Sequence, residues 1–411
     1  MPNPVLEVQI ETHAYGGECL ARAADGRRVF VRGTLPGEQV RVQVTEERPS
    51  YLRARTVEVL RPSDMRVTPR CAHYGECGGC HLQHMHYAAQ LAAKNDVLRE
   101  QLRRLGGVEG PPLLEAIASP AEWNYRNYVQ FSLAADGRLG YMRLGSRHVL
   151  AIRECHLPEP LLDEIWPALD MREAQGITQV GLRADTDGET MVLLEGGEAG
   201  MPEVQVERSL SVAWLAPGGR SSILVGEDAL HFSVSGQSYR VSPGSFFQVN
   251  TGLLPMLVEQ VLALAEVGAG DTALDVYCGV GLLSAFLARR AGRVVAVEAS
   301  PSAAADFEDN LASFDNVELY EATAAAVLPH LEIRPQVAVV DPPRAGVDRE
   351  AMAGLVRLAP RRIVYVSCDP STLARDARAL QAAGYSLATL IPIDLFPQTY
   401  HIESISLWRA T

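Results

Sequence analysis

The strongest constraint on the fold is a repeat of short apolar runs and helical stretches that fills the chain from residue 241 onward. The runs are Thr272–Val276, Val294–Val297, Val337–Val340 and Arg362–Val366. Short strands that alternate with helices predict a parallel, doubly wound sheet. Such sheets bind ligands at the carboxyl ends of their strands. Side chains that directly follow the four runs are therefore the first candidates for a functional site.

The N-terminal segment, residues 1–60, has a different pattern. In Val5–Ile10, Val40–Thr45 and Arg53–Leu60, apolar residues recur at alternate positions, and glycine-containing turns separate the runs. Alternation of this kind indicates half-buried strands. We therefore predict a small β-barrel over residues 1–60.

Residues 61–240 combine several patterns. They hold a group of cysteines, a segment with helical leucine spacing from about Ala88 to Leu105, and strands such as Thr190–Glu195 between glycine-rich turns. These features predict a central α+β domain, with its helix able to pack on the C-terminal domain. The barrel, this central domain and the doubly wound domain of residues 241–411 together predict a multidomain α/β protein.

The net charge of −13 argues against a global positive field for nucleic-acid binding. Residues 1–70, however, carry 11 Arg against 9 Asp and Glu, a net charge of +2. Binding to RNA would have to use local arginine patches, since Lys94 is the only lysine. No apolar run suits a membrane span, and Met1–Val5 does not begin a signal peptide. We expect a cytoplasmic monomer.

A glycine turn follows the first apolar run. Gly279 and Gly281 allow a ligand to approach the backbone, but Ser284 stands where a dinucleotide fingerprint has its third glycine. Glu298 ends the next strand and can accept both hydroxyls of a ribose. The combination favours a nucleoside without phosphates, namely S-adenosylmethionine, over a nicotinamide dinucleotide. A structural turn without a ligand is the alternative.

Two further loops follow the last two runs. Asp341-Pro-Pro-Arg344 resembles the acid-Pro-Pro loop of amino-group methyltransferases, with Arg344 in place of the usual aromatic residue. Cys368 follows the next strand and is a candidate nucleophile. A small buried hydrophobic residue is the alternative. Arg344 could lower the pKa of this thiol, which is near 8.5 for a free cysteine.

Methylation of uracil at carbon 5 explains why such a thiol would be needed. Attack on carbon 6 moves electron density to carbon 5, which can then accept a methyl group, and a base must remove the carbon 5 proton. Glu403 is the candidate base. Methylation of cytosine on RNA commonly uses two cysteines, but only Cys368 lies on a suitable loop, and Cys278 is expected to be structural.

Three cysteines are clustered at Cys71, Cys77 and Cys80, and Cys155 is the candidate for a fourth ligand. The chain has seven cysteines, an odd number, and three of them are clustered. This pattern favours metal binding or catalysis over disulfides. Four thiolates suit an iron–sulfur cluster or zinc, and spacing alone does not decide between them. Radical enzymes that use S-adenosylmethionine have a different cysteine spacing, so this pattern argues against radical chemistry. Nearby histidines are not expected to be ligands.

Over nearly its whole length, the chain resembles the RNA uridine-5-methyltransferases that carry an N-terminal TRAM domain and a four-iron four-sulfur cluster. Three segments resemble TRAM, an RNA-binding β-barrel: Tyr15–Glu18, Val29–Val31 and Pro36–Glu38. The segments Phe246–Asn250, Leu274–Gly281, Ser367–Asp376 and His401–Glu403 match family motifs.

The resemblance implies a role for each matching residue. It implies that Cys368 is the nucleophile and Glu403 the base, that Gln248, Tyr277, Glu298 and Asp341 bind S-adenosylmethionine, and that Cys71, Cys77, Cys80 and Cys155 hold the 4Fe-4S cluster. Phe246 and Arg344 are candidates for contacts with RNA, Phe246 by stacking on a displaced base unless it is a core aromatic.

The resemblance also implies a substrate. Members with both features mostly modify large-subunit (23S) ribosomal RNA, and some act on the tRNA T-loop uridine. A non-catalytic RNA-binding iron–sulfur protein is the alternative from another class. The sequence departs from the family at Cys19, where glycine is common, and at Asp369, where asparagine is commoner. We assign no adenine contact to Glu321–Thr323.

Overall fold

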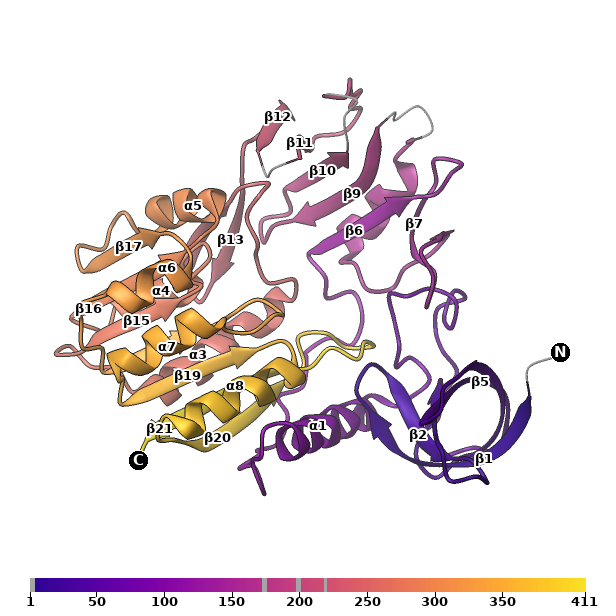
Figure 1. The fold of residues 1–411 in the computed structure, drawn as a ribbon. Helices are drawn as coiled ribbons and strands as arrows, with labels where there is room; N and C mark the ends of the chain where they lie inside the picture. The colour runs from indigo at the N-terminus through magenta and orange to yellow at the C-terminus, as the bar shows by residue number, and fades with distance from the viewer. Residues whose placement is uncertain (1–3, 172–175, 197–200, 218–219) are drawn as a thin grey trace.

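The computed structural model describes residues 4–171, 176–196, 201–217 and 220–411. Residues 1–3 of the N-terminal segment considered above lie outside these ranges. An N-terminal barrel, a central sheet and a C-terminal layered domain follow one another along the chain (Figure 1). Within the described ranges, no helix has both the length and the apolar character needed to cross a membrane.

The N-terminal barrel is closed, as the alternating sequence predicted. Its strands pair in the order β1-β2-β3-β5-β4. Their bounds are β1 Val5–Ala14, β2 Glu18–Arg22, β3 Arg28–Arg32, β4 Gln39–Glu47 and β5 Tyr51–Arg61. Val29, Val31, Val40 and Val42 are fully buried inside, while Phe30 and Arg41, which alternate with them, are partly exposed. Closure of the barrel leaves no unpaired strand edge.

The central domain is a seven-stranded sheet in the order β12-β11-β10-β9-β6-β7-β8. Its strands are β6 Tyr128–Leu133, β7 Leu139–Met142, β8 Val149–Ala151, β9 Ile177–Ala184, β10 Thr190–Gly196, β11 Ser211–Leu215 and β12 Ser221–Val225. The helix α2 (Pro160–Ile165) and the 3-10 turn η1 (Trp166–Ala168) cover one face. Phe131, Trp166 and Trp214 pack in this core.

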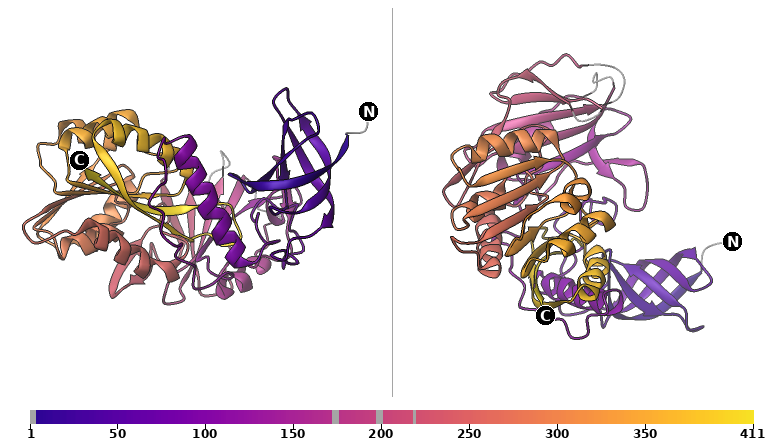
Figure 2. Two further views of the ribbon diagram at one scale, coloured as in Figure 1. Left: turned by 90° about the horizontal axis from the view of Figure 1, so that it is seen from below. Right: turned by 60° about the vertical axis from the view of Figure 1, so that its left-hand side comes forward.

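The helix predicted between Ala88 and Leu105 is α1, Tyr87–Arg104. It packs against the C-terminal helix α8 (Pro370–Ala382), and Figure 2 shows it in purple beside the yellow end of the chain. Leu98 and Leu102 of α1 are fully buried in a core shared with the C-terminal domain. Lys94, 5% exposed, donates to Asp394 at 2.5 Å and to the Phe396 carbonyl at 2.9 Å. The only lysine therefore ties α1 to the loop that precedes Glu403.

The C-terminal sheet has the order β17-β16-β15-β18-β19-β21-β20. Its strands are β15 Thr272–Val276, β16 Arg293–Glu298, β17 Val317–Glu321, β18 Val337–Val340, β19 Arg362–Ser367, β20 Tyr385–Ile393 and β21 Glu403–Ala410. Alternate residues of the strands enter two separate cores. One core holds α3 (Leu254–Ala265), α4 (Leu282–Ala288) and α5 (Pro301–Leu311), and the other holds α6 (Ala324–Val327), α7 (Arg349–Leu358) and α8.

The four apolar runs pair in parallel, as predicted, and the sheet contains one further strand that is reversed. β21 runs antiparallel to both β19 and β20. The loop of residues 394–402 joins β20 directly to its neighbour β21, and neighbouring strands joined by a loop without a crossover pair in opposite directions. The sequence patterns did not identify β20 or β21. The doubly wound arrangement of the other strands, with helices on both faces, is as predicted.

A separate hairpin leads into the C-terminal domain. Its strands are β13, Leu230–Val234, and β14, Gln237–Val241. Phe232 and Tyr239 are fully buried in the core that also contains α3 and α4. The hairpin therefore packs with the C-terminal sheet, although all of its residues except Val241 precede position 241.

Candidate functional site

The sequence-derived candidates gather at one edge of the C-terminal sheet. Tyr277, Asp341 and Cys368 each directly follow a parallel strand, and Glu298 ends one. Glu403 is the first residue of β21, and its neighbour Ser404 pairs with Ser367. Because β21 is antiparallel, its beginning lies where the parallel strands end. The reversed strand therefore places Glu403 beside the Cys368 loop, defined here as Ser367–Pro370.

The glycine loop, Tyr277–Gly281, has an unusual backbone. Tyr277 has a φ of 65° and Gly281 a φ of 90°, both in the left-handed region. A Cβ atom on Gly281 would lie 2.3 Å from Leu311 Cδ1, and the left-handed backbone would strain another residue, so glycine is favoured at this position. Left-handed conformation in a tyrosine costs about 1–3 kcal/mol and is typical of ligand sites. Two backbone amides, those of Tyr277 and Cys278, donate to the Val297 carbonyl and hold the loop.

Carboxylates fix the glycine loop from two sides. Glu298 Oε2 accepts the Gly279 N–H at 2.9 Å, and its Oε1 accepts the amides of Ala299 and Ser300. Ser284, which stands where a dinucleotide site has glycine, donates its hydroxyl to Asp275 at 2.6 Å. Burial raises the pKa of Asp275 to about 7. Ser284 is therefore part of the support for this loop.

The segment that carries Gln248 is held between domains. Asn127 of the central domain donates its side-chain amide to the Gln248 carbonyl and its backbone N–H to the Val249 carbonyl, both at 3.0 Å. Phe247 is buried in the core, whereas Phe246 is 67% exposed. Phe246 is therefore not a core aromatic, and its ring is available for contact with a ligand.

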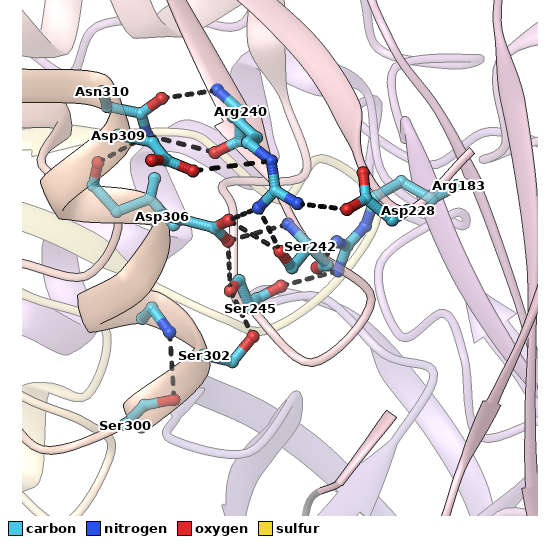
Figure 3. Close-up of polar contacts among 12 residues, drawn as sticks. Arg183, Asp228, Arg240, Ser242, Ser245, Ser300, Ser302, Asp306, Asp309 and Asn310 are labelled. Atoms are coloured by element: carbon cyan, nitrogen blue, oxygen red, sulfur yellow. Dashed lines mark hydrogen bonds and ion pairs between the residues drawn. The ribbon is translucent and has the colours of Figure 1, made fainter. Parts of the chain in front are cut away.

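A polar network supports the start of this segment (Figure 3). Arg183 from β9 donates to the carbonyls of Ser242 and Ser245. Asp306 of α5, fully buried, accepts the Ser242 N–H at 2.7 Å and the Ser245 hydroxyl at 2.5 Å, and also pairs with Arg240. A buried cation and a buried anion from two domains thus hold one loop. No sequence motif indicated Asn127, Arg183 or Asp306.

Cys368 lies between β19 and α8 and is partly buried. Burial raises the pKa of its thiol to about 12, and the nearby carboxyl groups of Glu403 and Asp341 act in the same direction. Arg344 lowers this pKa, as expected from the sequence, but the other effects are larger. The resting group is therefore a protonated thiol.

Glu403 is 3% exposed. Burial raises the pKa of Glu403 well above its ordinary value, the charge of Asp341 raises it further, and Arg344 opposes both. Burial also raises the pKa of Asp341 to about 7. The Arg344 guanidinium lies 3.3 Å from both ring nitrogens of His401. One arginine thus faces the thiol and the buried carboxyl group together.

The four cysteines Cys71, Cys77, Cys80 and Cys155 lie outside the C-terminal sheet. Burial raises the pKa of all four thiols, to about 12 for Cys80 and about 11 for Cys155. Neighbouring cysteines of the set raise the pKa of Cys77, Cys80 and Cys155 further, so the four lie close together. In the described ranges, no group of three or more His, Cys, Asp or Glu side chains is arranged to hold a metal ion.

Backbone contacts hold these cysteines together. The Gly78 N–H donates to the Met142 carbonyl and the Leu144 N–H to the Glu76 carbonyl. The Ala72 N–H donates to the Glu154 side chain at 2.5 Å. The three-cysteine loop is therefore bound to the hairpin of β7 and β8 and to the residue that precedes Cys155.

Two family models match separate parts of this chain. A TRAM domain model matches residues 1–57, and a tRNA (uracil-5-)-methyltransferase model matches residues 207–410. An uncharacterized RNA methyltransferase of Streptomyces avermitilis is 37% identical, over 98% of this chain and 97% of that protein. One from Aquifex aeolicus is 35% identical, over 99% of each chain.

A solved structure shares the fold over almost the entire chain. It is the Pyrococcus abyssi tRNA (uracil-54, C5)-methyltransferase in complex with S-adenosyl-L-homocysteine, with a TM-score of 0.73 and 24% identity over 98% of this chain and 100% of that one. The two bacterial relatives cover the barrel, the central domain and the catalytic sheet together. The chain therefore belongs to the TRAM-containing RNA (uracil-5-)-methyltransferase family and is an S-adenosylmethionine-dependent RNA methyltransferase.

Proposed function

We propose that the protein methylates carbon 5 of a specific uridine in large-subunit ribosomal RNA through a covalent cysteine–uracil adduct. The observation that carries this proposal is the pairing of β19 with the antiparallel β21, which sets Glu403 beside the Cys368 loop. Methylation of a nitrogen or a ribose hydroxyl would need no thiol, whereas activation of carbon 5 does.

In the proposed reaction, Cys368 and Glu403 act in turn. The Cys368 thiol first loses its proton to solvent, the resulting thiolate bonds carbon 6, and the electrons of the carbon 5–carbon 6 double bond pass to the enolate. S-adenosylmethionine supplies the methyl group as a sulfonium: the methyl carbon bonds carbon 5, its bond to sulfur breaks, and the neutral thioether S-adenosylhomocysteine leaves. Once carbon 5 carries the methyl group, Glu403 removes the carbon 5 proton, the double bond re-forms, and the Cys368 thiolate leaves. A buried carboxylate with a raised pKa binds a proton strongly, which suits this last step.

The ribosomal target rests on the family resemblance, since members with a TRAM domain and a cysteine cluster mostly modify that RNA. A second candidate is the T-loop uridine of tRNA, which is favoured by the likeness to the archaeal tRNA enzyme. The two RNAs can be distinguished in a strain that lacks the gene.

We expect such a strain to lose 5-methyluridine from 23S ribosomal RNA and to keep it in tRNA. Mass spectrometry of nuclease fragments from both RNAs measures this directly. The purified enzyme should restore the lost nucleotide and transfer no methyl group to an RNA without uridine. Loss of the modification from tRNA alone would move the target to the T-loop, and transfer to cytidine would refute the proposed reaction.

Glu298 is proposed to accept the ribose hydroxyls of the cofactor. Glu298→Gln keeps one oxygen for the amides of Ala299 and Ser300, but its NH2 group can accept neither the Gly279 N–H nor a ribose hydroxyl. Loss of a charge-assisted hydrogen bond costs about 1.5–3 kcal/mol, so affinity should fall about 10- to 100-fold. Calorimetry with S-adenosylmethionine measures the change. Glu318→Gln, which alters a surface ion pair on the next strand, is the control. Unchanged affinity in Glu298→Gln would exclude this role.

Cys71, Cys77, Cys80 and Cys155 are proposed to hold a 4Fe-4S cluster, with a structural role. What supports this proposal is the family resemblance and the chemistry of the four partly buried thiols, whose charges act on one another, since thiolates are the ligands of such a cluster. Protein purified without air should be brown and contain four irons and four sulfides per chain. Cys80→Ala should lose the iron, and Cys19→Ala, which alters a buried barrel cysteine, should keep it. A colourless protein with one zinc ion would refute the assignment.

A further inference from the structure

One turn of the N-terminal barrel reaches the catalytic loops. The turn connects β1 to β2 and includes Tyr15 and Gly17. The Tyr15 hydroxyl donates to Asp369 Oδ2 at 2.6 Å, although the two residues are 354 positions apart in the chain. Asp369 directly follows Cys368. The barrel therefore contacts the neighbour of the proposed nucleophile through a specific hydrogen bond to a carboxylate.

The two oxygens of Asp369 have separate partners. Oδ1 accepts the N–H groups of Ser371 and Thr372, at 2.8 and 3.2 Å, and so caps the start of α8. Oδ2 accepts the Tyr15 hydroxyl. The Asp369 N–H also donates to the Ser367 hydroxyl at 3.3 Å. The backbone of Cys368 is thus fixed from both sides, and Tyr15 orients the carboxylate that does this on one side.

The same turn also contacts the segment that carries Glu403. The Tyr15 ring meets the Tyr400 ring edge-on, with 5.8 Å between centroids, and Tyr400 packs on His401 at 4.5 Å. Gly17 has a φ of 76°, and a Cβ atom there would lie 3.3 Å from Tyr400 Cβ. A larger residue at Gly17 would press on this contact. The barrel turn therefore contacts the Cys368 loop, through Asp369, and the segment that precedes Glu403, through Tyr400.

We propose that the barrel supplies a positioning residue to the active site: Tyr15 holds Asp369, and through it Cys368, in the geometry for attack on carbon 6. The inference rests on the proposed role of Cys368. It differs from a barrel that only binds RNA, because a tether would need no hydrogen bond beside the nucleophile. Residue 369 is an aspartate, and a carboxylate accepts a phenol hydrogen bond more strongly than an amide does.

The test is Tyr15→Phe, which keeps the ring and its packing but removes the hydroxyl. We expect the rate of adduct formation with 5-fluorouridine RNA, measured in a single turnover, to fall about tenfold, which is about 1.4 kcal/mol. Affinities for RNA and for S-adenosylmethionine should stay within about twofold. Tyr385→Phe is the matched control, since it removes a tyrosine hydrogen bond of 2.8 Å at the opposite edge of the sheet.

A mutant cycle separates positioning from general stabilisation. In an Asp369→Asn protein, Tyr15→Phe should lower the rate by less than about twofold, because the charge-assisted bond is already gone. If Tyr15→Phe instead weakens RNA binding or lowers the unfolding temperature while the single-turnover rate is kept, the inference is overturned. A wild-type protein that forms no adduct would refute the proposed function, whereas a normal adduct rate in Tyr15→Phe would refute only this inference.

Discussion

Replacement of Cys368 by alanine should abolish methyl transfer while RNA and S-adenosylmethionine still bind. Without the thiol, carbon 6 receives no nucleophile, and carbon 5 of uracil is too poor a nucleophile to attack the sulfonium methyl. We expect the rate to fall by at least about 10⁴-fold, as when a covalent nucleophile is removed from other enzymes. Transfer of labelled methyl groups to a uridine-containing RNA measures the loss.

Two controls make this result specific. Cys19→Ala removes a buried cysteine of the N-terminal barrel, whose thiol donates a hydrogen bond to the Thr34 carbonyl. This variant should retain methyl transfer. RNA binding by Cys368→Ala should be unchanged, since alanine is smaller and the loop is held by Ser367 and Asp369. If Cys368→Ala still methylates uridine, the covalent mechanism is wrong.

The raised pKa of Cys368 gives the wild type a pH dependence with a definite sign. Its thiol has a pKa of about 12, so the thiolate is a minor form at neutral pH. Below that pKa, the thiolate fraction rises about tenfold for each pH unit. The rate of adduct formation should therefore increase with pH from neutral upward until another step limits it.

Replacement of Glu403 by glutamine should trap the RNA on the protein. Cys368 can still attack carbon 6 and carbon 5 can still accept the methyl group, but the carbon 5 proton has no acceptor, so the thioether cannot be eliminated. Nearly all of the RNA bound to the enzyme should end as a methylated covalent complex. A shifted band on a denaturing gel, lost in the Cys368→Ala Glu403→Gln double variant, measures this outcome.

The wild type offers a comparison. With 5-fluorouridine RNA it should be trapped in the same way, because fluorine cannot leave as a cation. Glu308→Gln, which changes an exposed carboxyl group on α5, should turn over normally. Glu403→Gln should not unfold the protein, because glutamine nearly matches the shape of glutamate and its neutral side chain can be buried at position 403. Free turnover by Glu403→Gln would show that another group removes the proton.

Local sequence patterns were sufficient for much of the fold. The apolar runs Thr272–Val276 and Val337–Val340 coincide with β15 and β18, and the alternating runs near the N-terminus became the closed barrel. These predictions succeeded because alternation and helical spacing record which side of a strand or helix is buried. The glycine loop could be located because a left-handed turn favours glycine at Gly281, and glycine is visible in the sequence.

Other features were decided only by the tertiary structure. The direction of β21 depends on hairpin pairing with β20, and that direction is what places Glu403 beside the Cys368 loop. The net pKa of Cys368 depends on burial and on carboxyl groups from other strands, so the sequence indicated only the smaller contribution of Arg344.

The contact between Tyr15 and Asp369 had no sequence signal either, because it joins the first domain to the last. The sequence by itself thus determined which residues directly follow the ends of the strands, since strand and turn patterns are local. The tertiary structure determined which of those residues meet, because strand direction, domain packing and burial depend on contacts between distant parts of the chain.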